Sequence, residues 1–195
     1  MNRPRVDMWP CSIAIAMTGG GCAMTVVPPA APEQPVRVLL VDHGRHASLL
    51  FPTDDPESLV EYAYGDWNWF ALGRDGALDV FPTLFLPTQG ALGRRNWPNF
   101  DTPADAEETI PCDVAHVLMV SGASASALRR RLDARFESNI DTRYESADAG
   151  LTFVHDDQPY CLLSGCNVTM AEWLRELDCE VRGCSLNADY VVRAR

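Results

Sequence analysis

The sequence predicts a mixed α+β domain. Short apolar segments typical of strands alternate with two segments of helical periodicity, and the connections between them are short. The chain has 195 residues, of which 47% are hydrophobic. That length and apolar content are enough for one domain with its own core.

Several segments have the apolar and β-branched content of strands. Residues 36–41 and 46–51 flank the turn-like His43-Gly44-Arg45 and are expected to pair as a hairpin. Further strands are expected at residues 60–64, 116–120, 151–154 and 190–192. The stretch from about 71 to 111 contains Gly, Pro and Arg, and we expect it to cover the site as helices and loops.

Two helices are expected in the second half of the chain. In the first, about 127–137, Leu128, Leu132 and Phe136 recur every four residues, and Ser124 or Ser126 is expected to cap it. In the second, 168–177, apolar residues recur at helical spacing; they are Val168, Ala171, Leu174 and Leu177.

The N-terminal residues have the features of an export signal. A basic start with Arg3 and Arg5 precedes a short apolar run, and small residues then precede Cys22. We expect residues 1–21 to be a lipoprotein-like signal peptide and Cys22 to be lipidated; ordinary cleavage near Ala30 is the alternative. Residues 22–35 are expected to be a flexible tether before a domain of residues 36–195. The expected location is the periplasm or the outer membrane.

Cysteine count and charge narrow the class of protein. Five cysteines follow Cys22, which suits an oxidising compartment, and Cys179 with Cys184 is an attractive disulfide; five buried thiols are the alternative. The formal net charge is −11, and the basic residues are scattered. Binding of nucleic acid is therefore not expected, because it needs a concentrated basic face. We expect no cofactor.

The segment around Cys166 carries the chemistry. Cys166 falls at or just before the start of the second helix. The helix dipole and unpaired N–H groups there favour a thiolate, so the sequence predicts a nucleophile with a lowered pKa. The backbone N–H groups of Cys166 and Asn167 are expected to face a developing oxyanion.

A thiolate nucleophile needs an imidazole within hydrogen-bond reach. His46 begins a strand, which would hold it rigidly, and it is the preferred base. His43 lies in the preceding turn, His116 opens an apolar strand typical of core histidines, and His155 lies in a polar segment.

Three short motifs resemble those of an uncharacterised bacterial family of exported proteins. His43-Gly44-Arg45-His46 resembles its Gly-Trp-His motif, with Arg45 where tryptophan is usual. The segment 61–66 resembles its Glu-Phe-Gly-Trp-Gly-Asp segment, and Gly165-Cys166-Asn167 its Thr-Cys-Asn motif. The resemblance covers roughly residues 36 to 178.

That family is similar to permuted papain-like enzymes, which include cell-wall peptidases and lecithin:retinol acyltransferases. The resemblance implies an antiparallel sheet packed against helices, with the nucleophile at a helix N-terminus. It implies a Cys166–His46 pair that acts on a peptidoglycan peptide or a lipid acyl group. A third polar group would come from the next strand, with Glu61 preferred over Tyr64 and Asp66.

Aromatic residues and two competing functions complete the predictions. Trp67, with Trp69 and Phe70, is a candidate for lining a substrate groove or for core packing. Asp42, His43 and His46 would suit a zinc hydrolase, but they share no helical face, so we expect no metal. The main alternative to an enzyme is a non-catalytic, lipid-anchored binding or scaffold protein of the cell envelope on the same fold.

Overall fold

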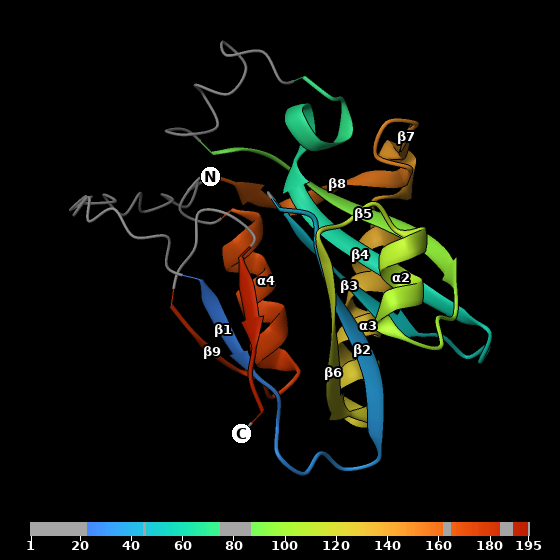
Figure 1. The fold of residues 1–195 in the computed structure, drawn as a ribbon. Helices are drawn as coiled ribbons and strands as arrows, with labels where there is room; N and C mark the ends of the chain where they lie inside the picture. Colours follow the sequence, from blue (N-terminus) through green and yellow to red (C-terminus); the bar gives the residue numbers. More distant parts are fainter. Residues whose placement is uncertain (1–22, 45, 75–86, 162–164, 184–188, 195) are drawn as a thin grey trace, which may run out of the picture.

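The computed structural model describes residues 23–44, 46–74, 87–161, 165–183 and 189–194. In that part of the chain, a seven-stranded sheet and a three-stranded sheet pack with a few helices (Figure 1). The predicted α+β class is therefore confirmed. The predicted signal peptide and Cys22 lie outside the described residues.

The large sheet is antiparallel throughout, with the strand order β6-β2-β3-β4-β5-β8-β7. Its strands in chain order are β2 (Pro35–Asp42), β3 (Ala47–Pro52), β4 (Ser58–Asp66), β5 (Thr88–Pro98), β6 (Val114–Ser121), β7 (Tyr144–Ser146) and β8 (Leu151–Tyr160). The predicted hairpin of the first two strands is confirmed, because β2 pairs with β3. The expectation of helices and loops at 71–111 is wrong for β5, which lies between β4 and β8.

Successive side chains of a strand point to opposite faces of the sheet, and in the large sheet apolar residues occur at both sets of positions, so both of its faces are apolar. In β3, Leu49 and Phe51 point into the main core beneath α3 (Gly122–Ser138) and α4 (Cys166–Glu176), whereas Leu50 points into a second core beneath α2 (Pro103–Thr109). Figure 1 shows α2 and α3 on opposite sides of the sheet. Two short turns, η1 (Trp67–Ala71, a π-helical turn) and η2 (Ile140–Thr142, a 3₁₀ turn), follow β4 and α3.

The two predicted helices form, with small corrections. The apolar stripe Leu128, Leu132 and Phe136 of α3 is buried as expected, but the helix begins earlier, with Ser121 as its N-cap. In α4, the predicted apolar face holds except at Val168, which is 41% exposed. None of the helices in the described ranges is both long and apolar enough to span a membrane.

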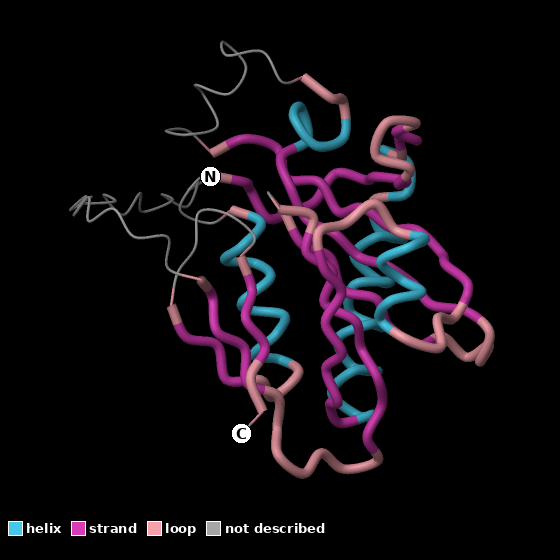
Figure 2. The backbone as a smooth tube through the Cα atoms, in the orientation of Figure 1, coloured by secondary structure: helices cyan, strands magenta, loops and turns pink. Residues whose placement is uncertain are grey.

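The small sheet corrects the predicted tether at residues 22–35. Strand β1 (Met24–Val27) lies between β10 (Tyr190–Val192) and β9 (Glu180–Arg182), parallel to the first and antiparallel to the second. Met24 and Val26 are buried in the main core. Figure 2 shows the small sheet beside α4. The alternating residues of 24–27 suit a strand, so this part of the expected tether belongs to the domain.

Candidate active site

A pocket of about 210 Å³ lies where β4, β8, η1 and the start of α4 meet. We call it the aromatic pocket; it is lined by His46, Tyr64, Gly65, Asp66, Trp69, Phe70, Tyr160 and Cys166. The predicted nucleophile and the predicted base therefore line one pocket, although they lie far apart in the sequence. Tyr64 and Asp66, two further predicted site residues, line it as well.

Cys166 is the first residue of α4, with Gly165 as N-cap. The Tyr160 hydroxyl and the backbone N–H groups of Asn167 and Cys166 interact with the thiol and favour its ionised form. Burial opposes them and is the larger effect, so the pKa of Cys166 is raised above its ordinary value. The placement of Cys166 is as predicted, but the expected lowering of its pKa is wrong, because removal from water outweighs the helix end.

His46 lies immediately before β3 and is held between two rings. The His43 ring stacks on it, with centroids 4.5 Å apart and planes 10° from parallel, and Phe70 meets it edge-on at 4.6 Å. Burial, with a smaller effect of His43, lowers the pKa of His46 to about 3. His46 is therefore neutral at physiological pH, the form in which an imidazole accepts a proton.

Glu61 does not take the place that we predicted for it. This buried carboxylate accepts a hydrogen bond from Trp97 Nε1 at 2.6 Å and one from Arg95 Nε at 3.2 Å. The histidine that it approaches is His43, whose Nε2 lies 3.8 Å from Oε1. Glu61 is on the same face of β4 as Ala63 and Gly65, away from the face that carries Tyr64, so it reaches His46 through His43.

His43 is fixed by groups on both ring nitrogens. Its Nδ1 lies 2.9 Å from the Pro111 carbonyl oxygen, and its Nε2 lies 3.1 Å from Ser48 Oγ. A ring held at both nitrogens can hold a second ring by stacking. The turn residue that sequence reasoning ranked below His46 therefore orients His46.

Asp66 organises the aromatic side of the pocket as a helix cap. Its buried carboxylate accepts from the Trp69 backbone N–H at 2.8 Å and from the Thr88 hydroxyl, and so fixes the start of η1. This turn presents Trp69 and Phe70 to the pocket. Trp67 points elsewhere: it packs in a separate apolar cluster, with its ring 4.2 Å from that of His155. Of the two roles considered for Trp67, the structure therefore agrees with core packing, and Trp67 does not line the aromatic pocket.

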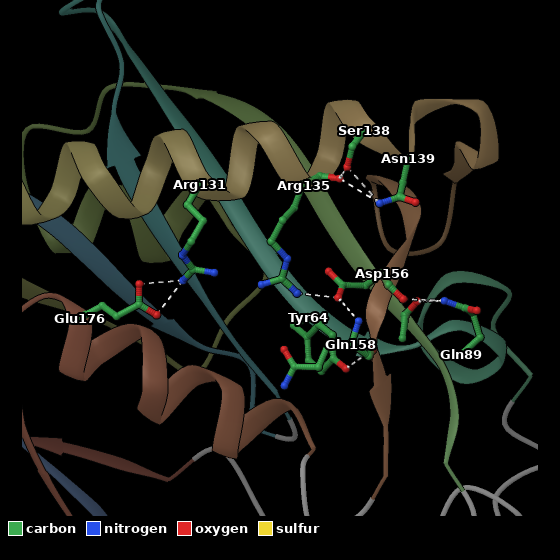
Figure 3. A network of polar contacts seen from close by, with 10 residues as sticks. Tyr64, Gln89, Arg131, Arg135, Ser138, Asn139, Asp156, Gln158 and Glu176 are labelled. Atoms are coloured by element: carbon green, nitrogen blue, oxygen red, sulfur yellow. Dashed lines mark hydrogen bonds and ion pairs between the residues drawn. The ribbon is translucent and has the colours of Figure 1, made fainter. Parts of the chain in front are cut away.

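A polar network links α3 to the end of β8, the strand that leads to Tyr160 (Figure 3). Arg135 of α3 donates to the buried Asp156 carboxylate at 2.5 Å, and the same oxygen accepts from the Gln158 N–H at 2.8 Å. The Gln158 carbonyl accepts from the Tyr64 hydroxyl at 2.9 Å. These bonds hold Tyr64 and the strand that ends at Tyr160.

The start of α4 is fixed from its other side. The Tyr190 hydroxyl donates to Asn167 Oδ1 at 3.3 Å, which links α4 to β10. Farther along, Arg131 of α3 donates to both carboxylate oxygens of Glu176, at 2.7 and 2.8 Å (Figure 3). The side chain of Asn167 is therefore structural, while its backbone N–H faces the thiol.

A second pocket of about 470 Å³ adjoins the first at His46 and Phe70, which line both. We call it the charged pocket, because His43, Glu61, Arg95 and Asp148 contribute to its wall. It opens on the side of the sheet opposite to α4. His46 thus lies between two cavities of different chemistry.

Sequence reasoning missed Tyr160 as a site residue. The signal that was present is its position, six residues before Cys166 and at the end of the polar segment that contains His155. That segment is in fact the second half of β8. The polar composition of this segment hid the fact that Tyr160 ends a strand and lines the same pocket as Cys166.

Several predictions concern cysteines and metals. No disulfide joins the described cysteines Cys112, Cys161, Cys166 and Cys179 to one another. Cys184, Cys22 and Arg45 lie outside the described residues. Within the described ranges, no group of three or more His, Cys, Asp or Glu side chains is arranged to hold a metal ion.

We compared the chain with protein-family models, with curated proteins and with solved structures, and none of them matches. The chemistry of this site is therefore inferred from its own residues.

Proposed function

We propose that this protein is an exported, permuted papain-like cysteine hydrolase or acyltransferase. The observation that carries the proposal is the aromatic pocket, whose wall includes both a helix-start cysteine and a neutral, ring-stacked histidine. The order of the two residues along the chain also supports the proposal, because the histidine beside a strand comes early and the cysteine at the start of a helix comes late. Cell-envelope amides or esters are the proposed substrates, and Cys22 is the proposed lipid anchor.

The proposed reaction begins with both partners neutral, because burial disfavours the charged form of each. As the Cys166 sulfur attacks the carbonyl carbon, its proton passes to His46. The resulting oxyanion accepts hydrogen bonds from the backbone N–H groups at the start of α4 and from the Tyr160 hydroxyl. Burial raises the pKa of Tyr160, so this hydroxyl keeps its proton and can donate.

Collapse of the tetrahedral intermediate breaks the bond between the carbonyl carbon and the leaving nitrogen or oxygen. His46 gives its proton to that leaving group, and a thioester remains on Cys166. Water, or an acceptor amine or alcohol, then attacks the thioester while His46 takes its proton. The sulfur leaves and regains a proton from His46. Hydrolysis and acyl transfer differ only in this second nucleophile.

A non-catalytic binding or scaffold role is the second candidate. The observation in its favour is the raised pKa of Cys166, which leaves the thiol mostly protonated at neutral pH. A scaffold would not need a reactive thiol. The two candidates are separated by the reactivity of Cys166 and by turnover.

The test is a cysteine-directed activity probe, followed by mapping of the labelled residue and assay of amide and ester hydrolysis. We expect Cys166 to be labelled and Cys166→Ala to lose at least about a thousandfold in kcat/KM. The control is Cys112→Ala, since Cys112 packs at the second core, on the α2 side of the sheet. Unchanged turnover in Cys166→Ala would rule out the proposal.

A further inference from the structure

The geometry points to an amphipathic substrate, an acyl compound whose apolar acyl group occupies the aromatic pocket and whose polar amine or alcohol leaving group occupies the charged pocket. This inference rests on the proposed function, because it assigns the two sides of the bond that breaks to the two sides of His46.

The two pockets share a wall, which fixes where the reaction takes place. His46 and Phe70 line both pockets, whereas Cys166 lines the aromatic pocket. The inference is that one substrate has its carbonyl carbon within reach of Cys166 in the aromatic pocket and its leaving group directed past His46 towards the charged pocket.

The chemistry decides which part of the substrate lies on which side. The acyl carbon becomes bonded to the Cys166 sulfur, so the acyl group stays in the aromatic pocket. The proton lost by the thiol travels through His46 to the leaving nitrogen or oxygen as its bond to the acyl carbon breaks. Because the acyl group and Cys166 take up the aromatic pocket, the leaving group is assigned to the side of His46 that faces the charged pocket.

The aromatic pocket is apolar because its polar atoms are used by the protein. The Asp66 carboxylate is occupied by Trp69 N–H and the Thr88 hydroxyl, and the Tyr64 hydroxyl by the Gln158 carbonyl. Its 210 Å³ exceed the roughly 150 Å³ of an apolar cavity that binds benzene. A phenyl ring or a short acyl chain fits this volume, which is too small to enclose the whole of a long lipid chain.

The charged pocket has fixed polar groups in its wall. Glu61 is buried, and Nε and Nη2 of Arg95 each lie 3.2 Å from its Oε2. The Arg95 guanidinium also lies 3.8 Å above the Trp97 ring, and Asp148 contributes an exposed carboxylate at the rim. The exposed Asp148 carboxylate can accept a hydrogen bond from a hydrophilic group, whereas an apolar group would remove it from water without one.

Four amides test the inference on the full-length protein. They combine a phenylacetyl or a dodecanoyl acyl group with an ethanolamine or a butylamine leaving group, and the released amine is quantified by mass spectrometry. We expect the phenylacetyl ethanolamide to have the highest kcat/KM. Each single change, to the long acyl group or to the apolar amine, should lower kcat/KM about tenfold or more.

Two variants assign each preference to its pocket. Trp69→Ala should relax the preference against the dodecanoyl group without changing the preference for ethanolamine. Asp148→Ala should reduce the preference for ethanolamine without changing the preference for the short acyl group. Both side chains are exposed, so neither change is expected to unfold the protein. Glu108→Gln, on the exposed side of α2, is the matched control.

The outcomes separate this inference from the proposed function. Turnover that depends on Cys166 but favours the dodecanoyl group or the butylamine overturns the inference alone. So does labelling of Cys166 by the cysteine probe with no turnover of any of the four amides. Turnover that persists in Cys166→Ala counts against the proposed function instead.

Discussion

At the scale of single residues, burial decides the protonation of the proposed catalytic pair. The N-terminus of α4 and the Tyr160 hydroxyl favour a thiolate at Cys166, but desolvation is stronger and raises its pKa. Desolvation likewise lowers the pKa of His46 to about 3. The resting pair is therefore thiol and imidazole rather than a preformed ion pair, and groups that stabilise charge during the attack become important.

Tyr160→Phe tests the group that is expected to stabilise the sulfur most directly. Removal of a hydrogen bond to a charged group costs about 1.5–3 kcal/mol, so alkylation of Cys166 by iodoacetamide at pH 8 should slow about tenfold or more. The measurement is the second-order rate of labelling, followed by mass spectrometry. Tyr144→Phe is the matched control, because Tyr144 is an exposed tyrosine of β7 that does not line the aromatic pocket. Equal rates for the two variants would remove Tyr160 from the mechanism.

His46 should give the protein an unusual acid response. An unfolded chain takes up a proton at His46 as the pH falls through about 6.5, whereas the folded protein does so only near pH 3. The stability that neutral His46 contributes is thus complete above pH 6.5 and declines as the pH falls from there towards 3, by at most about 1.4 kcal/mol per pH unit.

The measurement is the free energy of unfolding of wild type and His46→Phe between pH 8 and pH 3.5. The variant should lose stability less steeply below pH 6.5, and the difference at pH 8 reports packing alone. The kcat/KM of the wild type should show no fall centred near pH 6.5. An acid limb at that pH would mean that His46 titrates as an ordinary exposed histidine.

The sequence predicted that Cys166 and His46 share a site better than it predicted the contacts of their neighbours. The sequence pointed to Cys166 because a glycine precedes it at the start of a helical periodicity, and to His46 because a glycine precedes it at the start of a strand. A side chain at either position has a fixed direction. Glu61 was misplaced relative to His46, because the choice of its partner depends on which face of β4 meets the His43 turn. Such an arrangement is set by packing between strands and leaves no local signal.

At the scale of elements, the contact between α3 and β8 positions the site. Arg135 reaches from α3 to Asp156, and the Asp156 carboxylate holds the Gln158 N–H in the segment that leads to Tyr160. Asp156→Ala should therefore lower the free energy of unfolding by about 2–3 kcal/mol. It should also slow alkylation of Cys166, because Tyr160 loses its fixed position.

The neighbouring Asp157 provides the control for this element. Its side chain is exposed, so Asp157→Ala should change stability by no more than about 0.5 kcal/mol and leave labelling of Cys166 unchanged. Chemical denaturation gives the first quantity and the iodoacetamide rate the second. A stable Asp156→Ala protein with wild-type labelling would show that α3 does not position this site.

Strand β5 shows why an element can escape prediction. Gly90, Gly93 and two arginines lower its strand propensity, so the segment resembles a loop. The structure requires these glycines: a Cβ at Gly90 would overlap the Gln158 carbonyl, and one at Gly93 would lie 2.7 Å from the Phe153 ring. Glycine here permits close approach between neighbouring strands, a cause that lies in tertiary structure.

At the scale of the whole molecule, β1 joins the N-terminal part of the domain to the site. Met24 pairs with Tyr190 in the small sheet, and the Tyr190 hydroxyl bonds to Asn167 beside the nucleophile. The prediction of a tether was wrong at residues 24–27 because the features of an export signal end just before residue 24. A strand of four residues is also too short for its alternating pattern to be recognised in the sequence. Any anchor at Cys22 would be connected to the domain core without a long spacer.

Met24→Ala tests whether β1 is part of the cooperative domain. Met24 is 3% exposed and packs in the main core, so its truncation should lower the free energy of unfolding by about 2–5 kcal/mol. Thr25→Ala is the control, since Thr25 is half-buried outside that core and its backbone pairing would survive. A tether would behave differently: both variants would unfold with the wild-type midpoint. Loss of stability confined to Met24→Ala, with slower labelling of Cys166, would establish that β1 supports α4 and the thiol that it carries.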